Sequence, residues 1–184
     1  YYGKVFISKD GGLNWDNLNP GGKEKGNWRN ANLSADGKNI LISDYTRQLW
    51  RSADAGETWT QIQPDGDRDA NWIVAKMSED GKTILVSEYA RRSYISFDGG
   101  ETFKETRPDG DINKNWFGGY LSADGKKAFL GEELGNLYLT DVINNEDSNS
   151  TNQDNSDHNP DSIPENDNTN SAQTEINTVN FIEK

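Results

Sequence analysis

Side chains able to bind polar ligands gather at two adjacent positions that recur along this sequence. Asp44 and Tyr45 are followed 44 residues later by Glu88 and Tyr89, and arginines stand close to both pairs. An aromatic face stacks on a sugar ring or an apolar side chain, while carboxylate and guanidinium groups form hydrogen bonds with hydroxyl groups. We therefore predict a site for a glycan or a protein partner, formed by Asp44, Tyr45, Arg47, Asp67, Glu88, Tyr89, Arg91, Arg92 and Asp111.

The same carboxylates allow two other interpretations. Glycoside hydrolases use two carboxylates on opposite sides of a cleft, and residues such as Asp44 and Glu88 have the required type. Acids that recur at one repeat position (44, 88 and 132) are also what packing and salt-bridge roles produce. The sequence contains no nucleophilic triad, phosphate-binding loop or zinc-ligand spacing. We therefore assign no catalytic residue from the sequence.

A short acidic run resembles the start of a calcium-binding loop. Asp65, Asp67 and Asp69 alternate as calcium ligands do, but Ala70 stands where such a loop needs Gly and Lys76 where it needs Glu. The only histidine of the chain is His158, and cysteine is absent. We expect neither a metal nor another cofactor, with calcium as the weaker alternative.

These candidate residues belong to a tandem repeat of 44 residues. Three markers recur in register without an insertion, which makes a chance match very improbable. Each repeat has a segment that begins with Ser and ends with an aromatic residue, an Asn-Trp pair and an Asp-Gly-Lys turn. The segments are SKDGGLNW (8–15), SADAGETW (52–59) and SFDGGETF (96–103); the pairs lie at 27–28, 71–72 and 115–116, and the turns at 36–38, 80–82 and 124–126.

One repeat has the pattern of four antiparallel strands. In the first complete unit we expect strands at 28–34, 39–43, 48–53 and 57–63, with Asp36 and Gly37 forming a type I′ turn in which both residues have positive φ. The apolar run 40–42 predicts a strand covered on both faces, as in sheets that pack face to face. Four strands in about 44 residues is typical of one blade of a β-propeller.

The pattern Ser-x-Asp-x-Gly-x-Thr-Trp resembles the Asp box (BNR repeat) of sialidases, sortilin-type receptors, xyloglucan-active glycosidases and the photosystem II assembly factor of the YCF48 type. The resemblance implies a structural role for each box: the Asp accepts hydrogen bonds from backbone N–H groups, the Gly adopts positive φ and the aromatic residue packs into the blade. It also implies that the boxes lie away from the binding face. The box residues are Ser8, Asp10, Gly12, Trp15, Ser52, Asp54, Gly56, Trp59, Ser96, Asp98, Gly100 and Phe103.

We predict an all-β fold, a partial β-propeller of four-stranded antiparallel blades, over residues 1–142. Half a blade (4–18), two whole blades (28–63 and 72–107) and three strands of another (116–140) are expected. The array stops where Val142 occupies the position of the fourth box Asp. Because an incomplete propeller leaves strand edges unpaired, we expect further blades in a longer chain or self-association.

Residues 143–184 have a different composition from the repeats. They hold 1 of the 19 basic and 9 of the 31 acidic residues and none of the 6 Trp or 18 Gly. We expect a disordered acidic linker or tail. A net charge of −12 without a basic cluster argues against nucleic-acid and membrane-surface partners, and no apolar run is long enough to cross a bilayer.

Taken together, these features predict a non-catalytic binding or scaffold propeller that recognises a glycan or protein through the face opposite the boxes. The alternative is a fragment of a glycoside hydrolase, sialidase-like or xyloglucanase-like, although the Arg-Ile-Pro segment of sialidases is absent. Since the sequence begins with Tyr1 rather than Met, we expect a processed or excised chain, and we expect a secreted or cell-surface protein.

Overall fold

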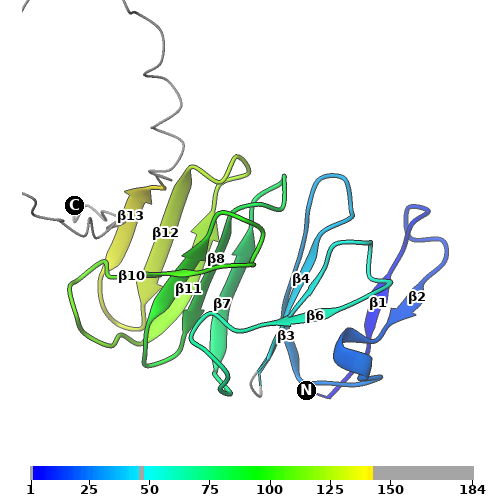
Figure 1. The fold of residues 1–184 in the computed structure, drawn as a ribbon, viewed down its shortest axis with the longest axis horizontal. Helices are drawn as coiled ribbons and strands as arrows, with labels where there is room; N and C mark the ends of the chain where they lie inside the picture. The colour runs from blue at the N-terminus through cyan, green and yellow to red at the C-terminus, as the bar shows by residue number, and fades with distance from the viewer. Residues whose placement is uncertain (1, 46–47, 143–184) are drawn as a thin grey trace, which may run out of the picture.

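The computed structural model describes residues 2–45 and 48–142, which form a row of antiparallel β-sheets (Figure 1). The only helical element in these residues is a short 3-10 helix, η1 (Pro20–Gly22). The all-β prediction is therefore confirmed for the part of the chain that the structure describes. The predicted disorder of residues 143–184 lies outside the described residues.

Four sheets follow one another in chain order, and each corresponds to one predicted blade or part of a blade. The first sheet has two strands, the second and third have four, and the fourth has three. Every predicted strand is present, with ends shifted by at most a few residues. The strands are β1 (Val5–Ile7) and β2 (Asp16–Leu18); β3 (Trp28–Leu33), β4 (Ile40–Asp44), β5 (Leu49–Ser52) and β6 (Thr60–Ile62); β7 (Trp72–Met77), β8 (Ile84–Glu88), β9 (Ser93–Ser96) and β10 (Lys104–Thr106); and β11 (Trp116–Leu121), β12 (Lys127–Glu132) and β13 (Leu137–Asp141).

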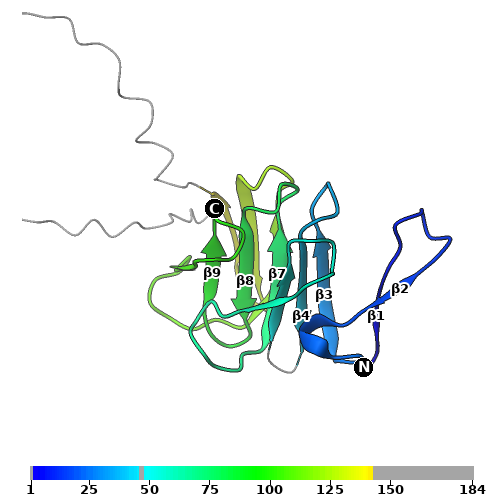
Figure 2. The same cartoon turned by 45° about the vertical axis from the view of Figure 1, so that its right-hand side comes forward.

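The sheets pack face to face along the row (Figures 1 and 2). Strands β3, β7 and β11, the first of each of the last three sheets, lie beside one another. Asn30 and Asn32 of β3 donate side-chain hydrogen bonds to the carbonyl groups of Ile73 (3.3 Å) and Ala75 (2.7 Å) of β7. The first strands of neighbouring sheets are thus joined by direct polar contacts as well as by packing.

The second strand of each complete sheet buries side chains on both of its faces. In β4, Ile40 and Ile42 pack toward the first sheet while Leu41 packs toward the third. In β8, Ile84 and Val86 join the same core as Leu41, and Leu85 joins the core shared with the fourth sheet. The prediction of a strand covered on both faces is confirmed.

Each Asp box is held together by hydrogen bonds among its own residues. In the second box, Ser52 Oγ donates to Asp54 Oδ1 (2.7 Å) and accepts from the backbone N–H of Gly56 (2.8 Å). The backbone N–H and the hydroxyl of Thr58 both donate to the Asp54 carboxylate (2.9 and 2.5 Å). The first and third boxes repeat this arrangement around Asp10 and Asp98, and the glycines at positions 12, 56 and 100 have φ of 93°, 90° and 95°. The roles implied for Asp and Gly are confirmed, and the Ser hydroxyl adds a hydrogen bond to each box.

The predicted packing of the box aromatic residue is found in the second and third boxes but not in the first. Trp59 and Phe103 pack against the cores on either side of the second sheet, whereas Trp15 is 60% exposed. Trp15 still donates its indole N–H to the carbonyl of Gly12, as Trp59 does to Gly56. The prediction for Trp15 is wrong because no sheet precedes the first sheet among the described residues to cover this ring.

The type I′ prediction for the Asp-Gly turn is also wrong. Of its two central residues only Gly37 has positive φ (73°), since Asp36 is not among the residues with that conformation. The turn closes instead with the N–H of Gly37 donating to the carbonyl of Ser34 (2.9 Å), while Asp36 Oδ1 accepts from the N–H of Lys38 (3.0 Å). The Asp side chain therefore caps the turn without entering the left-handed region.

A strained alanine in the second box gives the first prediction. Ala55 has φ of 59°, at the position where the other two boxes have glycines (Gly11 and Gly99) with φ of 75° and 74°. Because a Cβ in this region costs roughly 1 to 2 kcal/mol, Ala55→Gly should raise the free energy of unfolding by about 1 kcal/mol. Ala53→Gly in the same turn, where φ is not positive, should not stabilise the protein. Urea unfolding of both variants tests this, and equal effects would contradict it.

The box carboxylates predict how stability changes in acid. Hydrogen bonds from the hydroxyl and then the N–H of Thr58 lower the pKa of Asp54 from 3.8 to about 2. Since the pKa is lower in the folded state, this stabilisation is complete above about pH 4 and is lost as the pH falls toward 2. The difference in Tm between the wild type and Asp54→Asn should therefore shrink between pH 4 and pH 2. A difference that stays constant over this range would count against the assignment.

Candidate functional site

The connections opposite the Asp boxes gather the predicted site residues at one end of the sheets. Because antiparallel strands alternate in direction, the β4–β5, β8–β9 and β12–β13 connections share this end with the linkers between sheets. We call it the loop end; it is the lower end in Figure 1. The candidate residues other than Arg47, which lies outside the described residues, are found here.

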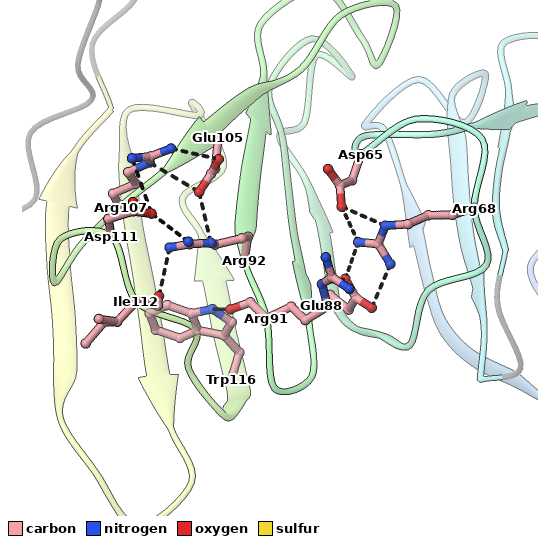
Figure 3. Close-up of polar contacts among 10 residues, drawn as sticks. All are labelled: Asp65, Arg68, Glu88, Arg91, Arg92, Glu105, Arg107, Asp111, Ile112 and Trp116. Atoms are coloured by element: carbon pink, nitrogen blue, oxygen red, sulfur yellow. Dashed lines mark hydrogen bonds and ion pairs between the residues drawn. The ribbon is translucent and has the colours of Figure 1, made fainter.

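Arg68 joins two acids across the boundary between the second and third sheets (Figure 3). Its guanidinium forms ion pairs with Asp65 of the same linker and with Glu88 at the end of β8. The carboxylate of Glu88, whose side chain is only 7% exposed, also lies 3.4 Å from Nε of Arg91. These contacts raise the pKa of Arg68, and the hydrogen bonds that its guanidinium donates to Glu88 are the main cause. The buried carboxylate of Glu88 is thus held between two guanidinium groups.

A second network surrounds Arg92 on the outer part of the third sheet (Figure 3). Its guanidinium contacts Glu105 (3.2 Å) and Asp111 (2.6 Å) and donates to the carbonyl of Ile112 (3.0 Å). Arg107 contacts the same two carboxylates. Arg92 and Asp111, both predicted to bind a ligand, therefore bind each other and fix the linker to the fourth sheet.

The acids at positions 44, 88 and 132 share one structural environment. Lys114 pairs with Glu132 (2.7 Å) and with Asp109, while Lys23 lies 3.7 Å from the carboxylate of Asp44. The side chains of Asp44 and Glu132 are 3% and 11% exposed. Each acid that ends the second strand of a sheet is therefore near a cation from the preceding linker. These cations stand at different repeat positions (23, 68 and 114), so the repeat alone does not reveal them.

Two carboxylates beside Lys114, those of Glu132 and Asp109, have lowered pKa values. Burial raises the pKa of Glu132, but the hydrogen bond from Lys114 outweighs it and the pKa lies below its usual value. The Lys114 ammonium also lowers the pKa of Asp109. A general acid near neutral pH needs a raised pKa, so neither carboxylate has the environment of one.

Tyr45 is exposed to solvent, unlike the largely buried acids at positions 44, 88 and 132. Its ring is 55% exposed, and the guanidinium of Arg29 lies 5.1 Å from the ring centre. Asn27 and Trp28 complete the wall of a pocket of about 490 Å³ that these four residues line. A second pocket of about 450 Å³, which shares Asn27, is lined by charged residues from 23 to 25 and by Asp44. An exposed ring beside a guanidinium and an amide suits a sugar hydroxyl face or a polar peptide.

Tyr89, the repeat equivalent of Tyr45, is already engaged. Its hydroxyl donates to the carboxylate of Glu133 (2.9 Å), and this hydrogen bond is the main cause of its raised pKa. Glu133 in turn stands at the repeat position of Tyr45 and Tyr89. The three residues thus form a row across the sheets in which only Tyr45, beside Arg29, presents an exposed ring.

The indoles at the start of the first strands fasten the preceding loops. Trp116 donates its N–H to the carbonyl of Arg91 (3.1 Å), and Trp28 donates to the carbonyl of Gly3 (3.0 Å), in each case 25 residues earlier. This contact positions the loop that carries Tyr89 and Arg91. Trp28 combines this role with a place in the wall of the pocket beside Tyr45.

The acidic run in the linker before β7 does not converge. Asp65 is paired with Arg68, and Asp67 accepts from the side-chain amide of Gln63 (2.8 Å). Over residues 2–45 and 48–142, no group of three or more His, Asp or Glu side chains has an arrangement that could hold a metal ion. No helix in this part of the chain is long and apolar enough to cross a membrane.

Two further observations place this fold among known proteins. Residues 94–105 match the family described as BNR/Asp-box repeat, whereas no curated protein matches the sequence. This match covers the third box, and the first two boxes have the same internal hydrogen bonds. The sheets resemble solved propeller structures, with identities low enough that the likeness concerns the fold alone.

The structural relatives include enzymes and a peptide-binding protein. A GH74 enzyme from Niastella koreensis matches with TM-score 0.55 and 18% identity over 75% of this chain and 24% of its own. A GH74 xyloglucanase from Xanthomonas campestris matches with 0.55 and 19% over 74% and 23%. YCF48 bound to D1 peptide matches with 0.50 and 15% over 62% and 36%. The chain spans roughly a quarter to a third of the length of these relatives.

Sequence reasoning missed Arg29 and Asn27, which complete the pocket around Tyr45. Arg29 does not recur, since Ile73 and Phe117 replace it in the next repeats. The Asn27-Trp28 pair was visible as a repeat marker. Because a marker of a repeat is more often structural, its place in a pocket could be found only from the geometry.

The ion pairs of the loop end give a stability prediction. Arg68→Met removes the cation that bridges Asp65 and buried Glu88, so the free energy of unfolding should fall by about 2 kcal/mol. Arg107→Met is the matched control, because this side chain is 49% exposed and Glu105 keeps Arg92. We expect less than about 1 kcal/mol for the control. Equal losses in urea unfolding would show that Glu88 does not depend on Arg68.

Proposed function

We propose that this chain is the binding part of an Asp-box propeller that recognises a polar partner, a glycan or a protein segment, through its loop end. The observation that carries the proposal is the contrast between Tyr45 and the acids. The carboxylates of Asp44, Glu88 and Glu132 lie in protein ion pairs, while the Tyr45 ring is exposed beside Arg29 in a pocket. Groups already paired hold the scaffold, and exposed groups are left for the ligand.

The chemistry of the pocket narrows the ligand class. The ring offers a flat apolar surface, Arg29 donates to hydroxyl or carboxylate oxygens, and the amide of Asn27 can both donate and accept. The chain has a net charge of −12, so a strongly acidic polymer would be repelled at long range. A neutral oligosaccharide, or a peptide with one or a few carboxylates, meets these conditions. The structural neighbour solved with a bound D1 peptide supports a peptide as one of these ligand classes.

The binding proposal predicts opposite effects for the two ends of the sheets. Tyr45→Ala and Arg29→Ala should each weaken binding about tenfold, roughly 1.4 kcal/mol, without lowering Tm, because both side chains are exposed. Asp54→Ala in the box should lower Tm and leave the dissociation constant unchanged at temperatures where the protein is folded. Glycan and peptide arrays identify the ligand class, and titration calorimetry with the best probe measures each variant.

Three results would contradict this assignment. Binding to neither array would remove the proposed function. Loss of binding by a folded Asp54→Ala protein would place the site at the box end. Unfolding of the Tyr45→Ala variant would make this ring a structural residue.

The alternative that the GH74 neighbours support is a fragment of a glycoside hydrolase. In this case the acids of the loop end would act as catalytic carboxylates in a larger cleft. Release of reducing sugar from xyloglucan, or of sialic acid from a sialoside, by the wild type and its loss in Glu88→Gln would establish this alternative. Binding of an oligosaccharide without hydrolysis supports the non-catalytic proposal.

A further inference from the structure

Three residues form a row across the loop end of the second, third and fourth sheets. Tyr45, Tyr89 and Glu133 each follow the acid that ends the second strand of a sheet. The backbone N–H of each donates to the carbonyl of the Asn that precedes the first strand of the same sheet (positions 27, 71 and 115), at 2.7, 2.9 and 2.8 Å. Because the backbone is held in the same way each time, the row has one side chain at an equivalent position in each sheet.

The two ends of this row have opposite charges. The guanidinium of Arg29 lies over the ring of Tyr45, and the carboxylate of Glu133 accepts a hydrogen bond from the hydroxyl of Tyr89. Within residues 2–45 and 48–142, Arg29 forms no ion pair with a carboxylate and Glu133 forms none with a cation. Both side chains are exposed. The row therefore has a positive group at the second sheet and a negative group at the fourth, each able to pair with a ligand.

Two aromatic rings lie between these charges. Tyr45 is 55% exposed, and Tyr89 packs with one side against the core shared by the third and fourth sheets. The hydrogen bond to Glu133 is the main cause of the raised pKa of Tyr89, and Tyr45 is close enough to be a smaller cause. The neighbouring rings give an apolar surface that leads from one charge to the other.

An exposed leucine extends this apolar surface at the fourth sheet. Leu134 follows Glu133, has φ of 55° and is completely exposed. Ala90, at the same position of the third sheet, has φ of 60° and is exposed as well, although a sheet packs on each side of the third sheet. The exposure of this position therefore belongs to the hairpin itself. Since alanine is sufficient for the turn, the leucine adds an apolar side chain that contacts solvent and not the core.

The row has the length of a short extended peptide. Packed sheets lie about 10 Å apart, so the two steps from the second to the fourth sheet span about 20 Å. An extended chain covers roughly 3.3 Å per residue, so about six residues connect the two charges. An uncharged glycan would leave Arg29 and Glu133 without ionic partners, whereas a peptide can offer an acid, apolar side chains and a base in this order.

We propose that the loop end binds an extended peptide of about six residues that has an acidic residue toward one end and a basic residue toward the other. The acid pairs with Arg29 and the base with Glu133, while apolar side chains between them pack on Tyr45, Tyr89 and Leu134. This inference rests on the proposed function, because it assigns the ligand of the same surface.

The charges of the site and of the chain fit such a peptide. A carboxylate has about four lone-pair sites, so Glu133 can accept from a lysine or arginine while it keeps the hydrogen bond from Tyr89. The net charge of −12 attracts the basic end of the peptide at long range. The acidic end has Arg29 as its partner, so the two ends are distinguished and the peptide binds in one orientation.

The probes are synthetic hexapeptides with blocked ends, leucine and tyrosine in the middle and one charged residue at each end. Acid-to-base, base-to-acid, two-acid and two-base patterns are titrated into the full chain at low salt. One of the two dipolar peptides should bind about tenfold more tightly than the two-acid and two-base peptides.

Charge reversal should change this preference in a defined direction. Glu133→Lys should favour the two-acid peptide, and Arg29→Glu should favour the two-base peptide. Glu101→Lys is the matched control, because it makes the same change of charge at an exposed position of the third Asp box, at the opposite end of the sheets. This control should keep the preference of the wild type.

A glycine at position 134 separates binding from stability. Leu134→Gly removes the apolar contact together with a Cβ in the left-handed region, so the dipolar peptide should bind roughly fivefold more weakly while Tm rises. Ala90→Gly should also raise Tm, but it removes only one methyl group and should change the affinity less than about twofold.

Equal affinity for all charge patterns, or a preference that neither charge reversal shifts, would overturn the inference and leave binding at the loop end intact. Binding of an oligosaccharide but of none of the peptides would also overturn it, and the proposed function would stand. Binding of neither class would remove both. Thermal unfolding checks that each variant is folded, and Arg29→Glu and Leu134→Gly test the proposal independently if Glu133→Lys is unstable.

Discussion

The burial of side chains on both faces of the second strand in each complete sheet is the constraint on which this fold depends. Leu41 and Leu85 are completely buried on one face of their strands, and their neighbours Ile42 and Ile84 are buried on the other. A strand of this kind leaves a large apolar area exposed to water unless a sheet lies on each side, so one repeat cannot be stable alone. The stacking of repeats and the constant 44-residue step both follow from this requirement.

Polar groups at the two ends of the sheets obtain their hydrogen-bond and ion-pair partners in different ways. At the box end, the Ser, Asp and Thr side chains form hydrogen bonds with one another and with the backbone of the same turn, within eight residues. Each repeat therefore supplies all the partners that its own turn needs. At the loop end, the buried acid at the end of each second strand depends on a cation from a separate linker. Lys23, Arg68 and Lys114 supply it from different positions, which allows the linkers to differ. The loop end is therefore the part of the fold that can acquire a ligand without loss of the scaffold.

Features that depend on neighbouring residues of one repeat could be predicted from the sequence, and features that depend on contacts between distant segments could not. Strands and boxes were predictable because turn residues and apolar positions recur at a fixed step. The turn type at Asp36 was not, because Asp-Gly is compatible with both one and two residues of positive φ. The exposure of Trp15 depends on which sheets are present, and the partners of Glu88 and Glu132 depend on linkers without a common pattern. The pocket around Tyr45 required Arg29, whose position carries Ile or Phe in the other repeats.

The site is connected to the packing of the sheets through the first strand of the second sheet. Trp28 and Arg29 at the start of β3 line the pocket with Tyr45, and Asn30 and Asn32 of the same strand donate hydrogen bonds to carbonyl groups of β7. In a propeller the first strands of the blades surround the central channel. A ligand bound beside Arg29 would therefore contact a strand that the neighbouring sheet holds in place, and its binding free energy would add to the stability of that packing.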